Sequence, residues 1–572
     1  MAAKTGGAAR VIALLAIAGL GLSIPATGAG PARRAAAAVA PAGARHAPPG
    51  HPGAAAGQGI AAGSGAAWGS LLARADDLGP SRAATASVLV ALRTAHRPAA
   101  LLGWAAGHGL RAIWFTGQPT VLLAAAPAVL GRALRTRIDD FRLPGSAAPF
   151  YASRAPGTVP GALRGEVTAL GQITSLNRVH TERPGPVGPQ NGVPVGGLAP
   201  GGFVDSYGMR PLWNIGDIGR GQTIVFFEVD GYSPADLATY ASRFGLPAFA
   251  NPLPHLGPLN LKVEGESDMD IEVAHAIAPA ANLVYVNLAA FGGPDASPAS
   301  QFQQAFSTIA QDYPGAIWSL SLGQCEYLLS PADAGAVSHA VSAAEQAGTS
   351  VFVSSGDSGG MECLGVNQED PRIPAEGVAF PGDLPQVTSV GGTTLALTTA
   401  GQYLGETAWT EPFLSQGSTG GQSALFAQPS WQRAPGVVSS YSDGAVCGHP
   451  GGYCREVPDV SADAASATGA AVRVNGMWAT SGGTSLAAPV WAAMTALTDE
   501  YLRSHGHGPV GFANPLLYRL AQGSPPYPPF HDVTVGTNDF YPAGPGYDMV
   551  TGIGTPNAWN LTRDLATMAG RS

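Results

Sequence analysis

The stretch Ser481-Gly-Gly-Thr-Ser485-Leu-Ala-Ala-Pro489-Val-Trp-Ala-Ala joins a tight glycine turn to an apolar, alanine-rich helix. The turn delivers Ser485 to the mouth of that helix, where backbone N–H groups have no intrahelical partners and the helix macrodipole is positive. A serine in this position is well placed to attack a carbonyl group. Pro489 fits a first turn that does not need its N–H. Serine and threonine are also ordinary helix caps, so a buried capped helix is the alternative interpretation.

The residues before this stretch alternate between buried-strand and helix patterns, which predicts an α/β fold. The pattern is typical of a doubly wound, mostly parallel sheet with helices on both faces, whose active site lies beyond the carboxyl ends of the strands. Residues 403–457 are irregular and predicted to be rich in loops. The expected strands cover residues 222–229, 281–287, 316–322 and 350–355, and the expected helices cover residues 233–244, 267–277, 300–311 and 334–347.

A small α/β unit of its own is predicted over residues 67–182, an ordinary size for a domain. It is preceded by an Ala/Gly/Pro-rich segment, residues 30–66, that is predicted to be disordered, and followed by a Pro/Gly-rich linker, residues 183–202. Within the unit, strands are expected at residues 84–94, 111–116 and 120–125, and helices at residues 99–108 and 128–141.

Residues 1–29 are typical of a secretory signal peptide. Lys4 and Arg10 give a basic start, an apolar run from Val11 to Ile24 follows, and small residues before Ala29 offer a cleavage site. No later stretch reaches the roughly 18 uninterrupted apolar residues of a membrane span, so no membrane partner is expected. The sequence therefore predicts a secreted, extracellular protein.

The four cysteines fit an oxidising compartment, and they allow three pairings. Cys447 and Cys454 bracket a Gly/Pro-rich hexapeptide that suits a small disulfide loop, and Cys325 with Cys363 would then form the other bridge. Their spacing does not favour a zinc site.

Charge is divided unevenly along the chain. Residues 1–182 contain 17 Lys and Arg against 6 Asp and Glu, whereas residues 183–572 contain 13 against 33. The two parts should attract each other at neutral pH. The strongly acidic second part argues against nucleic acid as a partner.

The acidic stretch Glu266-Ser-Asp268-Met-Asp270-Ile-Glu272 opens one of the predicted helices. Residues i and i+4 share a helix face, so Glu266 and Asp270 form one pair and Asp268 and Glu272 form another on a different side. Two carboxylates at that distance repel when both are ionised, so they tend to share a proton in acid. The alternative is a solvated acidic helix start that the macrodipole favours.

A further motif, Ser355-Gly-Asp357-Ser-Gly, ends a predicted buried strand and presents one aspartate from a glycine turn. Asp357 could simply make an Asx-turn. Beside an activated serine, a protonated Asp357 could instead donate a hydrogen bond to an oxyanion, which requires a raised pKa or an acid medium.

Together the three motifs, Gly-Thr-Ser485-Leu-Ala-Ala-Pro, Glu266-x-x-x-Asp270 and Ser-Gly-Asp357-Ser-Gly, resemble those of the sedolisin (serine-carboxyl peptidase) family, in the same chain order. The resemblance implies that Ser485 is the nucleophile and Glu266 the general base that takes its proton. It implies that Asp270 orients Glu266 and that Asp357 donates to the oxyanion.

Two other positions are compared with this family. Glu228 resembles an acid that in some members extends the carboxylate network. The usual Ser-x-Ser-aromatic-Gly strand appears as Ser319-Leu-Ser321-Leu322-Gly323, with Leu322 in place of the aromatic residue. Residues 321–323 are still expected to form an edge strand that pairs with the substrate backbone.

The resemblance also implies an organisation for the whole chain. Residues 67–182 would be a ferredoxin-like activation propeptide that inhibits its own enzyme, residues 183–202 a processing linker, and residues 203–572 a subtilisin-like peptidase domain. The expected product is a secreted, monomeric, acid-acting serine endopeptidase that is made as a proenzyme and hydrolyses protein or peptide substrates through an acyl-enzyme on Ser485. A carboxylate base suits acid, where a histidine would be protonated.

The C-terminal sequence resembles the calcium site of the same family. The resemblance implies carboxylate ligands from Asp532 and Asp548 and backbone carbonyl ligands from Val533, Gly544 and Gly546. One structural calcium ion is therefore expected. The alternative is a Gly/Pro turn that happens to contain two aspartates.

Two rival hypotheses concern the function. The first is a conventional subtilisin-type triad of Asp230, His275 and Ser485, which occur in the subtilisin order. His275, however, lies in an apolar helix rather than in a His-Gly-Thr-like context. The second is a catalytically inactive binding protein with a peptidase-like fold, although every catalytic motif position is filled.

Overall fold

The computed structural model describes residues 63–181, 197–259, 261–292, 295–398, 401–412 and 415–570. The predicted signal peptide, most of the segment 30–66 predicted to be disordered, and most of the predicted linker lie outside these residues. Helix α1 (Gly63–Arg74) begins before the predicted end of the disordered segment. Among the described residues, no helix is both long enough and apolar enough to cross a membrane.

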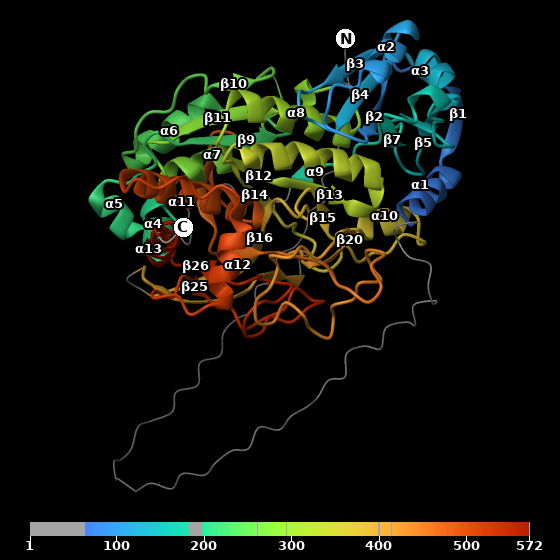
Figure 1. Ribbon diagram of the computed structural model, residues 1–572. Helices are drawn as coiled ribbons and strands as arrows, with labels where there is room; N and C mark the ends of the chain where they lie inside the picture. Colours follow the sequence, from blue (N-terminus) through green and yellow to red (C-terminus); the bar gives the residue numbers. More distant parts are fainter. Residues whose placement is uncertain are drawn as a thin grey trace, which may run out of the picture. The chain divides into compact units, whose positions relative to one another are not determined.

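An eight-stranded sheet forms the centre of residues 197–570 (Figure 1). Every neighbouring pair is parallel except the last, β16 with β17, which is antiparallel. In spatial order the strands are β10 (His255–Leu256), β11 (Asn282–Asn287), β9 (Thr223–Glu228), β12 (Ile317–Leu320), β14 (Ser350–Ser354), β16 (Thr388–Leu397) and β17 (Tyr403–Ala408), with β22 (Val460–Asp463) also paired to β16.

Side chains of each strand alternate between two hydrophobic cores, one on each face of the sheet. In β9, Ile224 and Phe226 pack with α7 (Glu266–Ile277) and α11 (Thr484–Ser504). Val225 and Phe227, one residue out of phase, pack with α8 (Pro298–Asp312) and α9 (Pro331–Gln346) on the other face. Helices on both faces of a mostly parallel sheet confirm the predicted doubly wound α/β fold.

The remaining helices and strands of residues 197–570 lie outside this sheet. Five helices contribute to the core on the α11 side: α4 (Pro200–Ser206), α5 (Arg210–Ile215), α6 (Pro234–Phe244), α12 (Asn514–Gln522) and α13 (Ala558–Ala569). The others are α10 (Leu364–Glu369) and the strands β13 (Leu322–Cys325), β15 (Ala379–Phe380), β18 (Thr410–Glu411), β19 (Gln416–Gly417), β20 (Gly421–Ala427), β21 (Cys454–Val457), β23 (Ala470–Val474), β24 (Met477–Ser481), β25 (Phe530–His531) and β26 (Thr555–Pro556).

Residues 63–181 form an N-terminal module around a four-stranded antiparallel sheet in the order β3–β4–β2–β7. With two of the module's three helices, α2 and α3, this sheet has the βαββαβ arrangement of a ferredoxin-like unit. Leu89 and Leu122 on the sheet belong to the same core as Phe302 of α8 and Val337 of α9, so the module packs on those helices. Its elements are β1 (Asp76–Pro80), β2 (Ala86–Leu92), α2 (Ala99–Gly107), β3 (Arg111–Trp114), β4 (Thr120–Ala125), α3 (Pro127–Leu134), β5 (Ile138–Arg142), β6 (Phe150–Ser153), β7 (Val167–Leu170) and β8 (His180–Thr181).

Several predicted boundaries were wrong for local reasons. The helix expected over residues 128–141 ends at Leu134, because Arg135 adopts a left-handed conformation (φ 54°), and the chain then continues as strand β5. The strand expected over residues 316–322 is divided, with β12 ending at Leu320 and β13 beginning at Leu322. The region 403–457, expected to be irregular, contains β17 and β20.

The two expected disulfides are present, Cys325–Cys363 and Cys447–Cys454.

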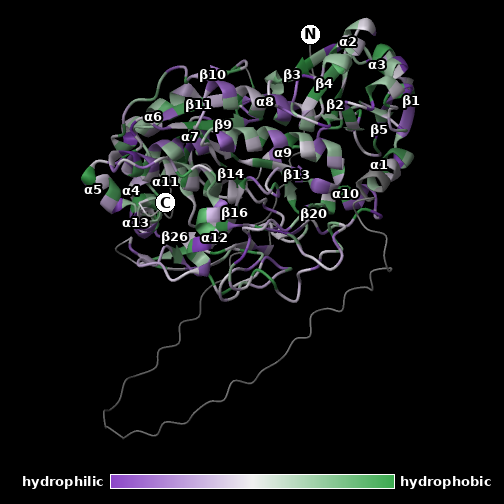
Figure 2. Cartoon of the chain, in the orientation of Figure 1, coloured by the Kyte–Doolittle hydropathy of each residue, from purple (hydrophilic) through white to green (hydrophobic). Residues whose placement is uncertain are grey.

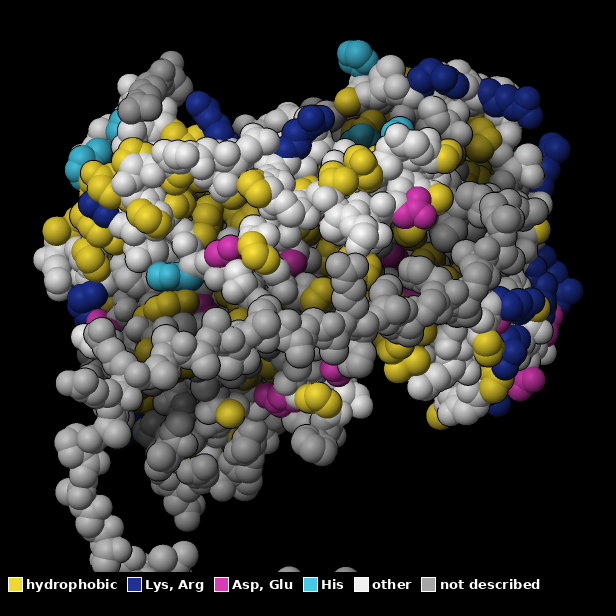
Figure 3. All heavy atoms as spheres, turned by 90° about the horizontal axis from the view of Figure 1, so that it is seen from below, with side chains coloured by type: hydrophobic (Ala, Val, Ile, Leu, Met, Phe, Trp, Pro, Cys, Tyr) yellow, Lys and Arg dark blue, Asp and Glu magenta, His cyan; other side chains and the backbone are white. Residues whose placement is uncertain are grey.

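Figure 2 shows hydrophilic and hydrophobic residues mixed along the helices on both faces of the central sheet. In Figure 3, Lys and Arg side chains gather toward the side on which the N-terminal module lies in Figure 1, in keeping with the basic composition of that part of the sequence.

Candidate active site

Ser485 is the second residue of α11 and is fully buried. The helix begins at Thr484, directly after Gly483, which adopts a left-handed conformation (φ 91°). Gly482 passes so close to Ala464 that an added Cβ atom would lie 2.3 Å from its carbonyl oxygen. The two glycines are therefore required by backbone geometry, and they fix Ser485 at the helix mouth as predicted.

Pro489 does not lie in the first turn, contrary to the prediction, but inside α11. A proline there cannot donate to the carbonyl four residues earlier, which is the carbonyl of Ser485. The hydroxyl of Ser321 replaces the missing donor, with Oγ 3.2 Å from that carbonyl oxygen. Pro489 thus explains why the side chain that directly follows the central strand β12 reaches the backbone of Ser485.

Ser321 also joins the backbone of Ser485 to Asp270. Its Oγ lies 2.5 Å from Asp270 Oδ2 as well as 3.2 Å from the Ser485 carbonyl oxygen. A hydroxyl has one hydrogen to donate, whereas an ionised carboxylate and a carbonyl are both acceptors. The Ser321 hydroxyl hydrogen is therefore shared between Asp270 Oδ2, the nearer acceptor, and the Ser485 carbonyl oxygen.

The four carboxylates of α7 are all buried, so the alternative of a solvated helix start is wrong. Glu266 and Asp270 lie one turn apart on the same helix face, as predicted. Asp268 accepts from Ser233 N at 2.8 Å, and Glu272 accepts from Arg473 N at 2.8 Å, so that second pair points toward other elements. The four acidic residues of α7 thus lie in two different environments.

Glu228, the last residue of β9, completes the buried acidic group. Burial is the main cause that raises its pKa well above the ordinary value, followed by the negative charges of Asp270, Asp230 and Glu266. The end of β9 therefore lies within electrostatic reach of the carboxylates of α7. This agrees with the resemblance of Glu228 to an acid that extends the carboxylate network in some members of the family.

Asp357 lies directly beside the start of α11. Its Oδ1 accepts hydrogen bonds from Thr484 N at 2.8 Å and from Thr484 Oγ1 at 2.9 Å, while Thr484 Oγ1 accepts from Gly356 N at 3.1 Å. These bonds tie the turn after β14 to the residue that precedes Ser485. The structure thus brings Asp357 and Ser485 together from segments that are far apart in the sequence.

Asp230 and His275 do not form the pair that a subtilisin-type triad needs, so that rival hypothesis is wrong. Asp230 accepts from the backbone N–H groups of residues 264–267 at 3.0–3.1 Å and from Ser267 Oγ at 2.5 Å, and so caps α7. His275 lies eight residues after Ser267, which is about 12 Å further along the axis of α7. Its Nε2 contacts Pro247 O at 2.8 Å, its ring packs on Phe249, and burial lowers its pKa.

The strand β13 that follows Ser321 has two antiparallel neighbours. On one side Gln324 and Cys325 pair with β15, and on the other Leu322 and Gly323 pair with Thr181 and His180 of β8. Leu322 is buried in the hydrophobic core on the α8 side of the sheet. The edge expected to receive a substrate strand therefore pairs with a strand of the N-terminal module.

The C-terminal loop brings together the two aspartates of the predicted calcium site. Asp532 Oδ2 accepts from Gly546 N at 3.0 Å, and Asp548 Oδ2 accepts from Gly544 N at 2.9 Å, so both carboxylates converge on residues 544–546. Among the described residues no group of three or more His, Cys, Asp or Glu could hold a metal ion. A cation here would depend on backbone carbonyls, such as those of Val533, Gly544 and Gly546, and on water.

A second buried carboxyl pair lies next to the end of β13. Ser423 Oγ lies 3.0 Å from Glu326 Oε2 and 2.7 Å from Asp383 Oδ2, and all three residues are fully buried. Burial, then the charge of Asp383, raises the pKa of Glu326 well above its ordinary value, and burial raises the pKa of Asp383 to about 7. Glu326 directly follows β13, so this pair lies behind the edge strand.

We expect the folded protein to lose stability as pH rises through about 7. A folded-state pKa above the unfolded value means that folding favours the protonated acid, so the stabilisation is complete below about pH 4 and is lost as pH rises through the folded pKa. Burial raises the pKa of Asp463 and Asp499 to about 7 as well. Urea midpoints of a Ser485→Ala background should therefore fall between pH 5 and pH 8.

Asp383→Asn in the same background should weaken this pH dependence, because the amide keeps contact with Ser423 but cannot ionise. Asp312→Asn, at the exposed end of α8, should leave it unchanged. Equal urea midpoints at pH 5 and pH 8 would show that the buried acids do not act in this way.

The sequence does not predict every functional contact. It predicts only an edge strand at Ser321, although the proline four residues after Ser485 signals that the Ser485 carbonyl needs another donor. It predicts only a glycine turn at Thr484, which donates to Asp357. The capping role of Asp230 could have been suspected from the adjacent Gly231, but its four partners become visible only in three dimensions.

The chain is similar to known peptidases. Residues 263–507 match the model described as the Subtilase family. Kumamolisin from Bacillus sp. (strain MN-32) is 34% identical over 375 residues, which cover 62% of this chain and 62% of kumamolisin. Sedolisin from Pseudomonas sp. (strain 101) is 30% identical over 473 residues, which cover 79% of this chain and 75% of sedolisin. The match to kumamolisin thus spans under two thirds of that protein.

The fold is also similar to that of a solved peptidase structure. The structure of Pseudomonas sedolisin, a serine-carboxyl proteinase complexed with two molecules of pseudo-iodotyrostatin, aligns with a TM-score of 0.52 and 27% sequence identity. The alignment covers 65% of this chain and 99% of that structure.

Proposed function

Since this chain belongs to the sedolisin family of serine-carboxyl peptidases, we propose that it is a secreted, acid-acting endopeptidase made as a proenzyme, with Ser485 as its nucleophile. The observation that carries this proposal is the link from the Ser485 backbone through Ser321 to Asp270, within a buried group of carboxylates. The basic partner that a neutral serine protease uses, a histidine, lies elsewhere and has other contacts.

The first step forms a tetrahedral intermediate on Ser485. Ser485 Oγ attacks the carbonyl carbon of the peptide, and its proton passes to the carboxylate of Glu266. The carbonyl electron pair moves to oxygen, next to Asp357. Because Asp357 Oδ1 already accepts two hydrogen bonds from Thr484, Oδ2 is the oxygen that would carry a proton and donate it to the oxyanion.

The later steps release both products. The oxyanion collapses and the C–N bond breaks as Glu266 gives its proton to the leaving amine, which leaves the acyl-enzyme on Ser485. Water then attacks the ester with Glu266 again as base, and the C–O bond to Ser485 breaks as Glu266 returns the proton to Ser485 Oγ. Asp270, held by Ser321, supports the charge changes on Glu266. Acid favours this arrangement, since Asp357 must stay protonated while Glu266 cycles.

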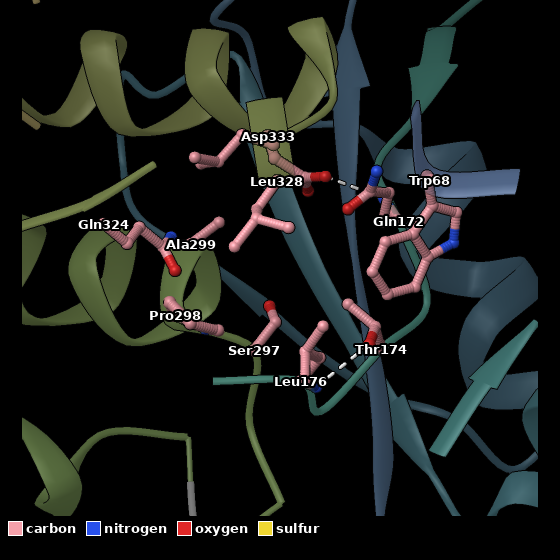
Figure 4. Close-up of a pocket in the computed structure, with 11 residues that line it drawn as sticks. Trp68, Gln172, Thr174, Leu176, Ser297, Pro298, Ala299, Gln324, Leu328 and Asp333 are labelled. Atoms are coloured by element: carbon pink, nitrogen blue, oxygen red, sulfur yellow. Dashed lines mark hydrogen bonds between the residues drawn. The ribbon is translucent and has the colours of Figure 1, made fainter. Parts of the chain in front are cut away.

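The N-terminal module fits the role of an activation propeptide (residues 67–182) that acts on its own enzyme. Its strand β8 pairs with the edge strand β13, the place expected for substrate. Elsewhere the two parts pack closely around a cavity of only about 20 Å³ lined by Trp68, Thr174 and Leu328 (Figure 4). There Asp333 Oδ2 accepts from Gln172 N at 2.8 Å, the bond drawn in Figure 4. The docked module would therefore exclude substrate.

Acid incubation of the purified full chain tests this proposal. We expect cleavage in the predicted linker, a segment outside the described residues, followed by activity on added protein. Protonation of acidic side chains should weaken attraction to the basic module, so lower pH and higher salt should both speed processing. N-terminal sequencing identifies the cleaved bond. A chain that matures equally well at neutral and acid pH would contradict the acid-release part of the proposal.

We also propose that the C-terminal loop holds one structural calcium ion. Carboxylate and carbonyl oxygens are the ligands that calcium prefers, and the loop offers both. EDTA should lower the melting temperature of the Ser485→Ala full chain by several degrees, since a bound ion stabilises only the folded state. Asp548→Ala should lower it without EDTA and remove the sensitivity, whereas Asp539→Asn, an exposed acid in the same region, should keep it. Equal melting temperatures with EDTA and with calcium would contradict a structural ion.

A further inference from the structure

A cavity of about 590 Å³ opens beside β13, and two carboxylates line it. Glu362 lies five residues after Asp357, and its side chain is fully buried. Glu369 is the last residue of α10, with a quarter of its side chain exposed. Cys325, the last residue of β13, lines the same cavity, so the two carboxylates adjoin the strand that is expected to receive substrate.

Both carboxylates contact basic side chains of the N-terminal module. Arg178 donates to Glu369, and His180 Nε2 lies 3.5 Å from Glu362 Oε1. Val179, between them, packs against the hydrophobic core on the α8 side of the sheet. Arg178 and His180 are two residues apart, the spacing that puts side chains on one side of an extended chain, and strand β8 begins at His180. Two basic side chains, two residues apart, thus meet two acidic partners.

The segment that carries these basic residues occupies the place of a substrate. His180 pairs with Gly323 and Thr181 with Leu322, in an antiparallel register. The residue directly before β13 is Ser321, whose carbonyl oxygen lies 3.4 Å from Ser485 Oγ. The chain therefore runs toward the nucleophile from residue 178 to residue 181. A peptide on the same edge would place two alternate side chains over Glu369 and Glu362, on the amino side of the bond to be cleaved.

We propose that Glu362 and Glu369 form an acidic subsite that selects peptide substrates with Lys or Arg at these two alternate positions. The inference rests on the proposed peptidase function and names the substrate class of that same site. Glu362 is the stronger determinant, because a carboxylate with no exposed surface gains most from an opposite charge and is screened least by salt. Glu369 is partly exposed and contributes less.

The direct test compares peptides that differ in a single charge. Synthetic peptides carry arginine or its uncharged analogue citrulline, either at the position that pairs with Gly323 or two residues before it, with every other residue the same. The enzyme is the full chain after acid activation. We expect kcat/KM to be about tenfold higher for arginine than for citrulline at the nearer position, as one charge-assisted hydrogen bond provides, and a few-fold higher at the farther one.

Two variants assign each preference to its carboxylate. Glu362→Gln should remove the preference at the nearer position only, and Glu369→Gln at the farther position only. Asp312→Asn removes one negative charge at the exposed end of α8 and should keep both preferences. A substitution that merely damaged the cavity would lower kcat/KM equally for arginine and citrulline peptides, and that result would overturn the proposed role.

The comparison of arginine and citrulline peptides with the wild-type enzyme tests the acidic subsite without any variant. The test therefore remains valid if a variant does not fold. Equal cleavage of arginine and citrulline peptides would overturn the acidic subsite while leaving the peptidase function intact. If no peptide is cleaved at any pH, both the subsite and the proposed function fail. The two failures are therefore distinguishable.

Discussion

Ser485→Ala is expected to abolish peptide-bond cleavage, lowering kcat by roughly 10⁶-fold, as removal of a serine nucleophile does in other serine peptidases. The variant lacks the only atom that forms the acyl-enzyme, and no neighbouring group replaces it. The full chain should consequently remain unprocessed in acid. Hydrolysis of a fluorogenic peptide and the electrophoretic pattern after acid incubation measure the two effects.

Loss of activity in Ser485→Ala should not reflect unfolding. The contact from Ser485 Oγ to Ser321 O is long, at 3.4 Å, so its removal should leave the melting temperature almost unchanged. Ser504→Ala is the matched control, because Ser504 lies at the other end of α11 and is exposed. If purified Ser485→Ala processed itself fully in acid, that result would contradict the assignment of the nucleophile.

Glu266→Gln is expected to lower kcat/KM by about 10³–10⁴-fold, because glutamine keeps the shape of the side chain but cannot accept the proton of Ser485. The effect should persist at every pH, since no change of protonation restores a base. Glu272→Gln tests the same chemical change on the same helix, where the side chain accepts from Arg473 N and faces away from Ser485. That control should retain activity within a few-fold.

His275→Ala separates the carboxylate mechanism from a histidine mechanism. The ring of His275 is buried beside Phe249, so its removal should cost stability through a cavity, in the range of about 1–3 kcal/mol. Activity per folded molecule should be retained in acid. If the His275→Ala variant were folded but inactive, and the Glu266→Gln variant were active, histidine rather than glutamate would be the base.

The fold could be predicted because its signals are local. Ser233 caps α6 through a bond to Asp236 N, and Ser330 caps α9 in the same way, so both helices begin within a few residues of where the sequence predicted them. Alternation of apolar strands and helices fixed the α/β arrangement. The helix end at Arg135 could not be predicted, because a non-glycine residue in the left-handed region depends on tertiary packing.

The candidate site was predictable in its motifs but not in its connections. Ser485, Glu266, Asp270 and Asp357 stand in recognisable sequence contexts. The hydrogen bonds at Asp270, Asp357 and the Ser485 backbone pass through Ser321 and Thr484, which have ordinary contexts and acquire their roles from the fold. The pairing of Glu326 with Asp383, and of Glu362 with His180, joins segments separated along the chain and therefore leaves no local pattern.

The central claim, that a carboxylate rather than a histidine serves Ser485, is tested most directly by the pH dependence of kcat/KM from about pH 2 to pH 8. A carboxylate base is ionised near pH 4, whereas histidine loses its proton near pH 6.5. We predict greatest activity in acid, a decline toward neutral pH as the protonated acids ionise, and the same profile for His275→Ala. A kcat/KM that rises through pH 6.5 to a neutral plateau and is lost in His275→Ala would contradict the account.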